Sequence, residues 1–136
     1  MSHNAKLSKE QCPTTQAEAN AIHVHPYRSL VGELLYIAMV ARPDILSAVN
    51  IAAQFSDNYG TYQWNELMHI VKYLITSKEL KLALGGDEPI ELRGYADASF
   101  HPDIDDTVSR TGFVVFCGQS PIAWGTHKQH ITSLST

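Results

Sequence analysis

The sequence has few residues of the kinds that build metal-bound or disulfide-bonded domains. Its 136 residues include only two cysteines, Cys12 and Cys117, which lie far apart and have no C-x-x-C companion. A zinc site or a disulfide framework is therefore not expected. The seven histidines do not change this expectation. His23 and His25 fall in a polar stretch, where we expect them to be solvated or lightly packed.

Long apolar runs and an excess of positive charge are missing as well. No stretch approaches the roughly 18 consecutive apolar residues of a membrane span, and the first residues lack the apolar core of a signal peptide. We therefore expect a soluble, intracellular protein without a membrane partner. The formal net charge is -4, so the chain as a whole would not attract nucleic acid, and such a partner would need a local basic face.

What the sequence does contain is a globular composition, with 44% hydrophobic and 18% charged residues. Residues 1–25 are polar, show no sustained period and are interpreted as a leader. From Pro26 apolar residues recur at the spacing of an amphipathic helix, which Arg42-Pro43 ends because the residue before proline disfavours helix. Pro43 also suits the first turn of a second helix, in which Asp44 lies at the positive end of the dipole.

A third helix is predicted after the break at residues 56–60, with Thr61 as its cap. Because each of the three helices is apolar on one side only, we expect them to pack together as a bundle over residues 26–79. The apolar stripe of the third helix consists of Trp64, Leu67, Met68, Val71, Leu74 and Ile75.

Residues 80–136 show the two-residue period of strands. We predict strands at 80–84 and 90–98, and a central, buried strand at 113–117, which is apolar on both faces. A last strand is expected to run from 122 through 131. The predicted fold class is therefore α+β, with a helical bundle followed by an antiparallel sheet.

Asp97 is the residue whose sequence setting is most typical of a catalytic or metal-binding site. It ends a predicted strand and is followed by small residues, so its carboxylate can point into a site and bind Mg²⁺. One carboxylate does not hold two ions roughly 4 Å apart, as two-metal phosphoryl transfer requires. The alternative is that Asp97 only ends a strand and accepts hydrogen bonds in the turn. The acidic group at 103–106 lacks the glycine and glutamate of an EF-hand, and we expect a solvated loop.

Lysines gather near the end of the third predicted helix. Lys72, Lys78 and Lys81 could contact a phosphate backbone, or they could interact with the negative end of the helix dipole. The sequence favours the second interpretation, because the first half of that helix carries no lysine or arginine.

Several stretches are similar, in order, to one family of polyproteins. Pro26–Tyr36, followed by Arg42-Pro43-Asp44-Ile45, resembles the part of copia-type retrotransposon Pol polyproteins where the reverse transcriptase passes into its thumb. The resemblance runs from about residue 6 to residue 136. Further matches are Ala48-Val49-Asn50, Trp64, Lys72-Tyr73-Leu74, Gly94-Tyr95-Ala96-Asp97-Ala98, Gly112-Phe113-Val114 and Pro121-Ile122-Ala123-Trp124.

This resemblance implies a three-helix, thumb-like bundle at 26–79 and a truncated ribonuclease H-like sheet at 80–136. Asp97 matches the first metal-binding aspartate of that nuclease, which implies a catalytic, Mg²⁺-binding role in the intact family. Lys72 and Lys78 would lie near an RNA–DNA hybrid or DNA duplex. The polymerase aspartates are expected before Met1 and the nuclease glutamate after Ser135. We therefore expect a fragment that is inactive alone and binds no Mg²⁺ tightly.

The family further implies the rest of the Pol polyprotein as a partner, and a location in cytoplasmic virus-like particles or the nucleus. One alternative is a domesticated module that uses the bundle to bind nucleic acid or protein. Another is a non-functional remnant of an old insertion, whose unpaired sheet edges would favour aggregation.

Overall fold

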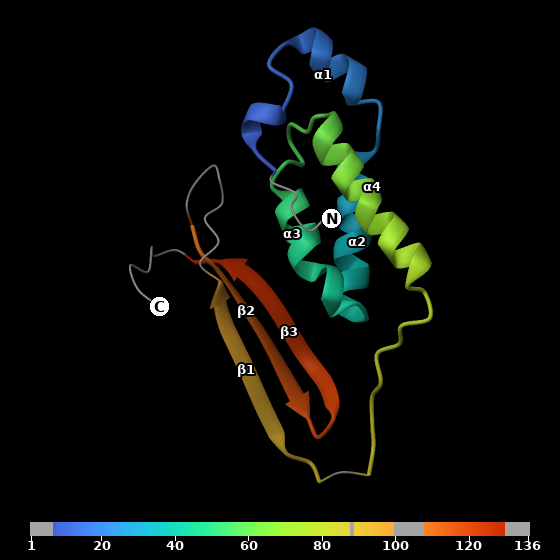
Figure 1. Cartoon of the computed structure of the whole chain (residues 1–136), viewed down its shortest axis with the longest axis vertical. Coiled ribbons are helices and arrows are strands. Elements are labelled where there is room, and N and C mark those ends of the chain that lie inside the picture. Colours follow the sequence, from blue (N-terminus) through green and yellow to red (C-terminus); the bar gives the residue numbers. More distant parts are fainter. Residues whose placement is uncertain (1–6, 88, 100–107, 130–136) are drawn as a thin grey trace.

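The computed structural model describes residues 7–87, 89–99 and 108–129, and within them the chain is α+β (Figure 1). The predicted order, helices first and an antiparallel sheet second, is confirmed. The helices are α1 (Gln16–Ile22), α2 (Tyr27–Val40), α3 (Leu46–Ala53) and α4 (Thr61–Thr76), with 3-10 turns η1 (Lys9–Gln11) and η2 (Pro43–Ile45). The strands are β1 (Leu92–Ser99), β2 (Arg110–Cys117) and β3 (Ser120–Lys128).

One hydrophobic core joins α2, α3 and α4, as the apolar stripes predicted, except that Ile75 of the predicted third stripe is 65% exposed. Helix α4 begins at Thr61 with Gly60 as its N-cap, so the predicted capping role of Thr61 is wrong. A β-carbon at Gly60 would lie 2.3 Å from the carbonyl oxygen of Gln11, so only glycine fits where the N-terminal segment crosses this helix start. The buried core side chains of the three helices are Tyr27, Val31, Leu34, Ala38, Leu46, Val49, Ala52, Leu67 and Ile70.

The segment predicted as a polar leader contains η1 and α1. Each begins with a capping box: Ser8 is paired with Gln11, and Thr15 is paired with Glu18. The patterns S-x-x-Q and T-x-x-E are sequence signals for such starts. The period analysis missed both elements because neither is long enough to show an apolar stripe.

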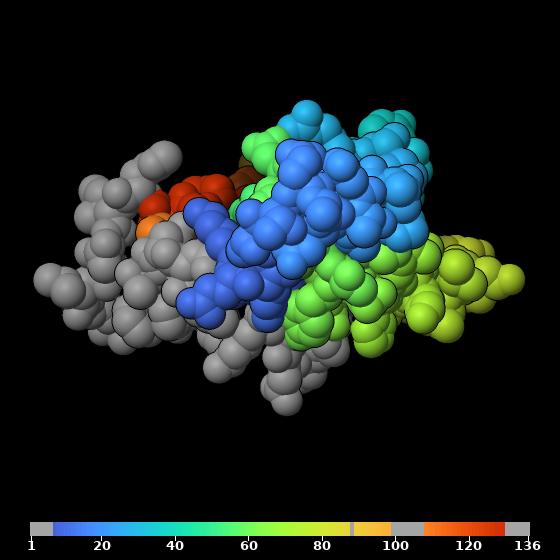
Figure 2. Space-filling model, turned by 90° about the horizontal axis from the view of Figure 1, so that it is seen from above, coloured from blue at the N-terminus to red at the C-terminus, as the bar shows by residue number. Residues whose placement is uncertain are grey.

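This N-terminal segment packs on the bundle. The buried Gln63 side chain of α4 donates from Nε2 to the carbonyl oxygen of Ser8 at 3.0 Å. The hydroxyl of Tyr59 donates to the carbonyl oxygen of His25 at 2.7 Å, and the His25 ring stacks on Trp64 at 4.4 Å. His25 is therefore half-buried, which agrees with the second of the two expected states, solvated or lightly packed. Figure 2 shows the blue N-terminal segment lying against the green surface of α4.

The sheet differs from the predicted one at its first strand. Residues 80–84 form no strand, and the amide of Gly85 instead donates to the hydroxyl of Ser120 at 2.7 Å. Strand β1 starts at Leu92, and its register with β2 is continuous to Ser99. A run of alternating apolar residues needs a neighbouring strand to pair with, and in the described ranges 80–84 has none.

Strand β2 is central, as predicted, but none of its residues is buried, and Phe113 is 40% exposed. Strand β3 is one continuous strand with a register irregularity opposite Val115 and Phe116. Its predicted end near Ile131 lies outside the described residues. The predicted burial failed because the helices contact the sheet mainly through β3.

Two side-chain hydrogen bonds connect β3 to the bundle. The indole Nε1 of Trp124 donates to the carbonyl oxygen of Ala38 at 2.9 Å, and Asn50 Nδ2 donates to the carbonyl oxygen of Thr126 at 3.3 Å. Strand β1 is consequently the strand farthest from this joint, at the other edge of the sheet (Figure 1). In the part of the chain that the structure describes, no helix is long and apolar enough to cross a membrane.

Candidate functional site

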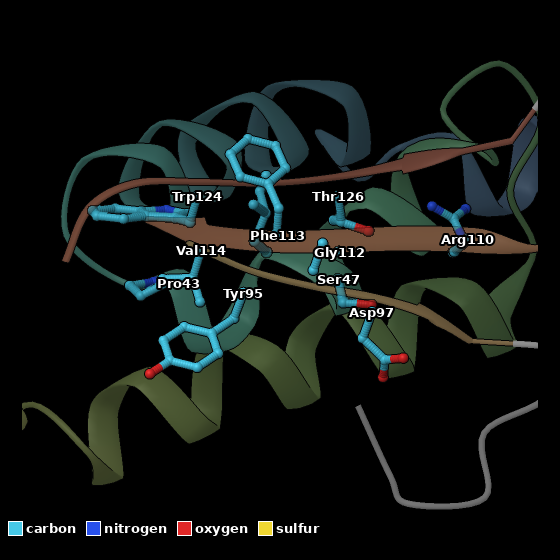
Figure 3. Close-up of a pocket in the computed structure, with 13 residues that line it drawn as sticks. Pro43, Ser47, Tyr95, Asp97, Arg110, Gly112, Phe113, Val114, Trp124 and Thr126 are labelled. Carbon is cyan, nitrogen blue, oxygen red and sulfur yellow. The ribbon is translucent and has the colours of Figure 1, made fainter. Parts of the chain in front are cut away.

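Asp97 lies on β1 and lines a cavity of about 640 Å³ between the sheet, η2 and α3. Tyr95 and Asp97 extend from β1 to the same side (Figure 3), as their two-residue spacing on a strand requires. The Cα partner of Asp97 is Gly112 on β2, which has no side chain to cover the carboxylate. Apolar and small side chains form most of the remaining wall, namely Pro43, Leu46, Val114, Trp124, Ser47 and Thr126.

Asp97 lies two residues before the end of β1, close to the predicted end of this strand. Asp97 is the sixth residue of the eight-residue strand β1, so it lies inside the strand, and its side chain is exposed to the cavity. Asp97 is thus placed where a ligand could reach it. The acidic residues at 103–106, which we expected to form a solvated loop, lie outside the described residues.

A second charged residue lines the same cavity. Arg110 begins β2, and its Cα partners are Ser99 and Lys128. Asp97 and Arg110 are therefore diagonal neighbours on adjacent strands, roughly 7–8 Å apart at the Cα level. Sequence analysis missed Arg110 because its position depends on the β1–β2 register and on no local motif. The cavity pairs an apolar wall with one carboxylate and one guanidinium.

These residues do not fit the two-metal centre that the family resemblance implies. Across residues 7–87, 89–99 and 108–129, no three His, Cys, Asp or Glu side chains lie close enough to hold a metal ion. Two Mg²⁺ ions need several converging oxygen ligands, and Asp97 is the only carboxylate among the described residues that line this cavity. No metal-dependent step follows from this arrangement.

Lys72 and Lys78 are exposed on and just beyond the second half of α4. Neither lies in the last turn of α4, which contains no basic residue. Lys78 directly follows the C-cap residue Ser77, so both the dipole and the phosphate interpretations of these lysines stay predictions. The guanidinium that reaches the end of α4 belongs to Arg42, whose Nη1 donates to the carbonyl oxygen of Ser77 at 3.3 Å.

Arg42 and Asp44, from the R-P-D-I motif, form a polar network at the end of α4. Arg42 donates from Nε and Nη2 to the two carboxylate oxygens of Asp44, at 2.9 and 2.7 Å. Its Nη2 also donates to Ser77 Oγ at 2.7 Å. The Tyr73 hydroxyl donates to Asp44 at 2.9 Å, and the guanidinium lies 5.5 Å from the Tyr73 ring centroid. The motif therefore holds η2 against α4.

This network should make stability depend on pH. The hydrogen bonds from Arg42 hold the pKa of Asp44 below its usual range. A carboxyl group with a lowered folded-state pKa stabilises the fold above its unfolded pKa of about 4, and this contribution is lost as pH falls through the folded-state pKa. We expect Asp44→Asn to lower the free energy of unfolding by about 1–2 kcal/mol at pH 7.

Urea denaturation of the wild type and Asp44→Asn at pH 7 and near pH 3 checks this expectation. The difference between the two proteins should shrink at the lower pH. Asp57→Asn is a suitable control, because Asp57 pairs only with Arg28 on the surface and both side chains are largely exposed. An equal loss in the two variants at pH 7, or a difference independent of pH, would contradict the assigned role of Asp44.

Comparison with known proteins identifies several relatives of this chain. No family model and no solved structure matches the chain. It is 39% identical over 131 residues to the retrovirus-related Pol polyprotein from transposon TNT 1-94 of Nicotiana tabacum. It is 36% identical over 103 residues to the corresponding polyprotein from transposon RE2 of Arabidopsis thaliana. These alignments cover 96% and 76% of this chain but only 10% and 7% of the polyproteins.

A further relative is much shorter. The secreted RxLR effector protein 161 of Plasmopara viticola is 29% identical over 111 residues, which are 82% of this chain and 78% of the effector. The polyprotein matches agree with the family resemblance of the R-P-D-I region and of the β1 segment. Over most of its length, the chain is a homologue of one short segment of copia-type retrotransposon Pol polyproteins.

Proposed function

We propose that this chain is a fragment of a copia-type Pol polyprotein and has no polymerase or nuclease activity alone. In this assignment α2–α4 correspond to the thumb of the reverse transcriptase, and β1–β3 correspond to the opening strands of a ribonuclease H-like domain. The observation that carries it is the 39% identity over 131 residues to a polyprotein of which the chain spans only 10%. The order of a helical bundle followed by an antiparallel meander is consistent with this assignment.

In the intact polyprotein, Asp97 would bind Mg²⁺ as one of several carboxylates. Its exposed position in a cavity beside β2 supports a ligand role, and among the described residues that line this cavity it is the one carboxylate. Bound Mg²⁺ would stabilise negative charge on a phosphate during hydrolysis. The fragment on its own should bind Mg²⁺ only weakly, since one carboxylate and water offer little selectivity over solvent.

Lys72 and Lys78 would contact the backbone of an RNA–DNA hybrid or a DNA duplex in the polyprotein. Both side chains are exposed and lie toward the same end of α4, Lys78 two residues past its last residue, which suits contact with one phosphate backbone. The formal net charge of -4 predicts that the fragment binds a duplex weakly, with an affinity that falls steeply as salt is added. Such a protein would act in cytoplasmic virus-like particles or in the nucleus.

A second candidate function is an interaction module that works without the rest of the polyprotein. The observation favouring it is the similarity to RxLR effector protein 161, which is aligned over 78% of its own length. The effector, a short protein, therefore contains the counterpart of most of this chain. The packing of the N-terminal segment on α4 supports this second candidate further, because that segment covers one end of the bundle.

One experiment tests both candidates. The purified chain is incubated with a fluorescent RNA–DNA hybrid at low salt and millimolar Mg²⁺ or Mn²⁺, and cleavage and anisotropy are followed together. We expect no cleavage by the wild type or by Asp97→Asn, while an intact ribonuclease H in the same buffer cleaves the hybrid. Cleavage that is lost in Asp97→Asn would refute the proposed inactivity. Binding without cleavage that persists at physiological salt, and is lost in Lys72→Glu/Lys78→Glu but kept in Lys9→Glu, would favour the interaction module.

A further inference from the structure

Two motifs of the sequence meet at the joint between the bundle and the sheet. Asn50 belongs to Ala48-Val49-Asn50, and Trp124 belongs to Pro121-Ile122-Ala123-Trp124. Their side chains make the two hydrogen bonds that connect β3 to α3 and α2. Neither motif has a role in the proposed function. Their contact therefore gives both motifs one structural position, in which the sheet is held on the bundle.

Trp124 binds a carbonyl group that α2 leaves without its usual donor. Ala38 lies in the last turn of α2, where carbonyl oxygens depend on partners outside the helix. The N–H of Arg42, four residues further on, donates to the carbonyl oxygen of Ile37 at 3.0 Å and not to that of Ala38. Ala38 is 0% exposed, so water does not readily replace a lost donor. The indole N–H of Trp124 therefore satisfies a buried acceptor, which is costly to leave unpaired.

Trp124 also packs on the core of the bundle. Among the described strand residues, it is the one apolar side chain that is packed against that core. Its Cα partner on β2 is Val114, whose partner on β1 is Tyr95, so these three side chains lie on one face of the sheet. Asp97 follows Tyr95 by two residues and shares this face. Trp124 thus holds the face that carries Asp97 toward the bundle.

The covalent connection between α4 and β1 leaves the orientation of the sheet to the joint. The described residues of this connection form no helix or strand, and residues 78–81 and 83–87 are exposed. From Gly85 onward the connection follows the sheet, because the Gly85 backbone bonds to the Ser120 hydroxyl. A further strand beside β1 would leave both hydrogen bonds of the joint unchanged, because β3 makes them at the other edge of the sheet.

We propose that Trp124 is a positioning residue, which holds the sheet on the bundle so that Asp97 faces η2 and α3 across one cavity. The bundle side of this cavity is lined by Pro43, Leu46 and Ser47. Both parts of the chain therefore build the site around Asp97, and a ligand bound there contacts both. In the intact polyprotein, a step that rests on the proposed function, the joint would keep Asp97 at a fixed place relative to the helices.

Thiol accessibility in the full chain tests this role. In a Cys12→Ser/Cys117→Ser background, Leu46→Cys places one thiol in the bundle wall of the cavity, where Leu46 is 7% exposed. Trp124→Phe keeps an aromatic ring but removes the N–H donor, so the sheet should leave the bundle more often. We expect the reaction rate of this thiol with DTNB to rise by about tenfold, as for the loss of a hydrogen bond to a buried acceptor. Asn50→Ala should change the rate in the same direction.

Gln63→Leu is the control that distinguishes the joint from general stability. It weakens the start of α4 and leaves the joint intact, so it should speed the reaction of a thiol at position 67, in the bundle core, but not at position 46. An unchanged rate at position 46 in Trp124→Phe would overturn the positioning role. An equal rise there in Gln63→Leu would do the same, because the thiol would then react only after global unfolding.

The measurement uses neither nucleic acid nor Mg²⁺. Its failure would therefore leave the proposed function standing, and hybrid cleavage by the chain would refute that function without affecting the joint. Circular dichroism confirms that each variant is folded.

Discussion

Replacement of Leu67 by alanine is expected to lower the free energy of unfolding by about 2–5 kcal/mol. The Leu67 side chain is 0% exposed and is among the largest fully buried side chains described. It lies on α4 and belongs to the core shared with α2 and α3. Shortening it removes apolar contacts and leaves a cavity that the close-packed helices cannot fully refill. Urea denaturation followed by circular dichroism measures the change.

Ile75→Ala is the matched control on the same helix. Ile75 is 65% exposed, so its truncation removes little buried surface and should cost less than about 1 kcal/mol. If the two substitutions lowered stability equally, Leu67 would not be the buried core residue that the structure describes. The contrast also distinguishes a packing effect from a loss of helix propensity, because alanine favours helix at both positions.

Gln63→Leu should have the second-largest effect, a loss of about 2–3 kcal/mol. Gln63 is fully buried, and its amide accepts from the Gly60 N–H at 3.0 Å and donates to the carbonyl oxygen of Ser8 at 3.0 Å and to Gln11 Oε1 at 3.2 Å. Leucine has a similar volume but no polar atoms. The Gly60 N–H would then be buried without a partner, and the N-terminal segment would lose its hydrogen bonds to α4.

Thermal or urea denaturation gives the stability change, and limited trypsin digestion shows where it occurs. Faster cleavage after Lys9 in Gln63→Leu is expected, because η1 is then held less firmly. Gln16→Leu serves as the control, since Gln16 is exposed and its amide donates only to Asn20. A Gln63→Leu protein with unchanged stability and unchanged cleavage after Lys9 would show that the N-terminal segment does not depend on this amide.

The helices α2, α3 and α4 could be predicted because each has an apolar face long enough to show a 3.6-residue period. The strand order could be predicted in part, since β2 and β3 are separated only by the turn at Gly118, where φ is +60°. The strand at 80–84 was predicted wrongly because alternation alone does not supply a pairing partner. The capping boxes that start η1 and α1 were readable in the sequence and were overlooked.

The candidate site was less predictable than the fold. Asp97 was identified from its local sequence, but its neighbours in the cavity come from η2, α3, β2 and β3. Arg110 joins Asp97 only through the register of two strands, and no local pattern encodes that register. Arg42 was interpreted as a helix end, although it binds Ser77, 35 residues further on. Long-range polar contacts of this kind depend on the packing of whole elements.

The positions of the two tryptophans provide intrinsic spectroscopic probes of two different joints. Trp64 stacks on His25, so its fluorescence should report whether the N-terminal segment remains on the bundle. Trp124 donates to the carbonyl oxygen of Ala38, so its emission should respond to separation of the sheet from α2. Because the chain has only these two indoles, replacing either by phenylalanine leaves a single signal assigned to one joint. The order in which the two joints open can thus be followed without an added label.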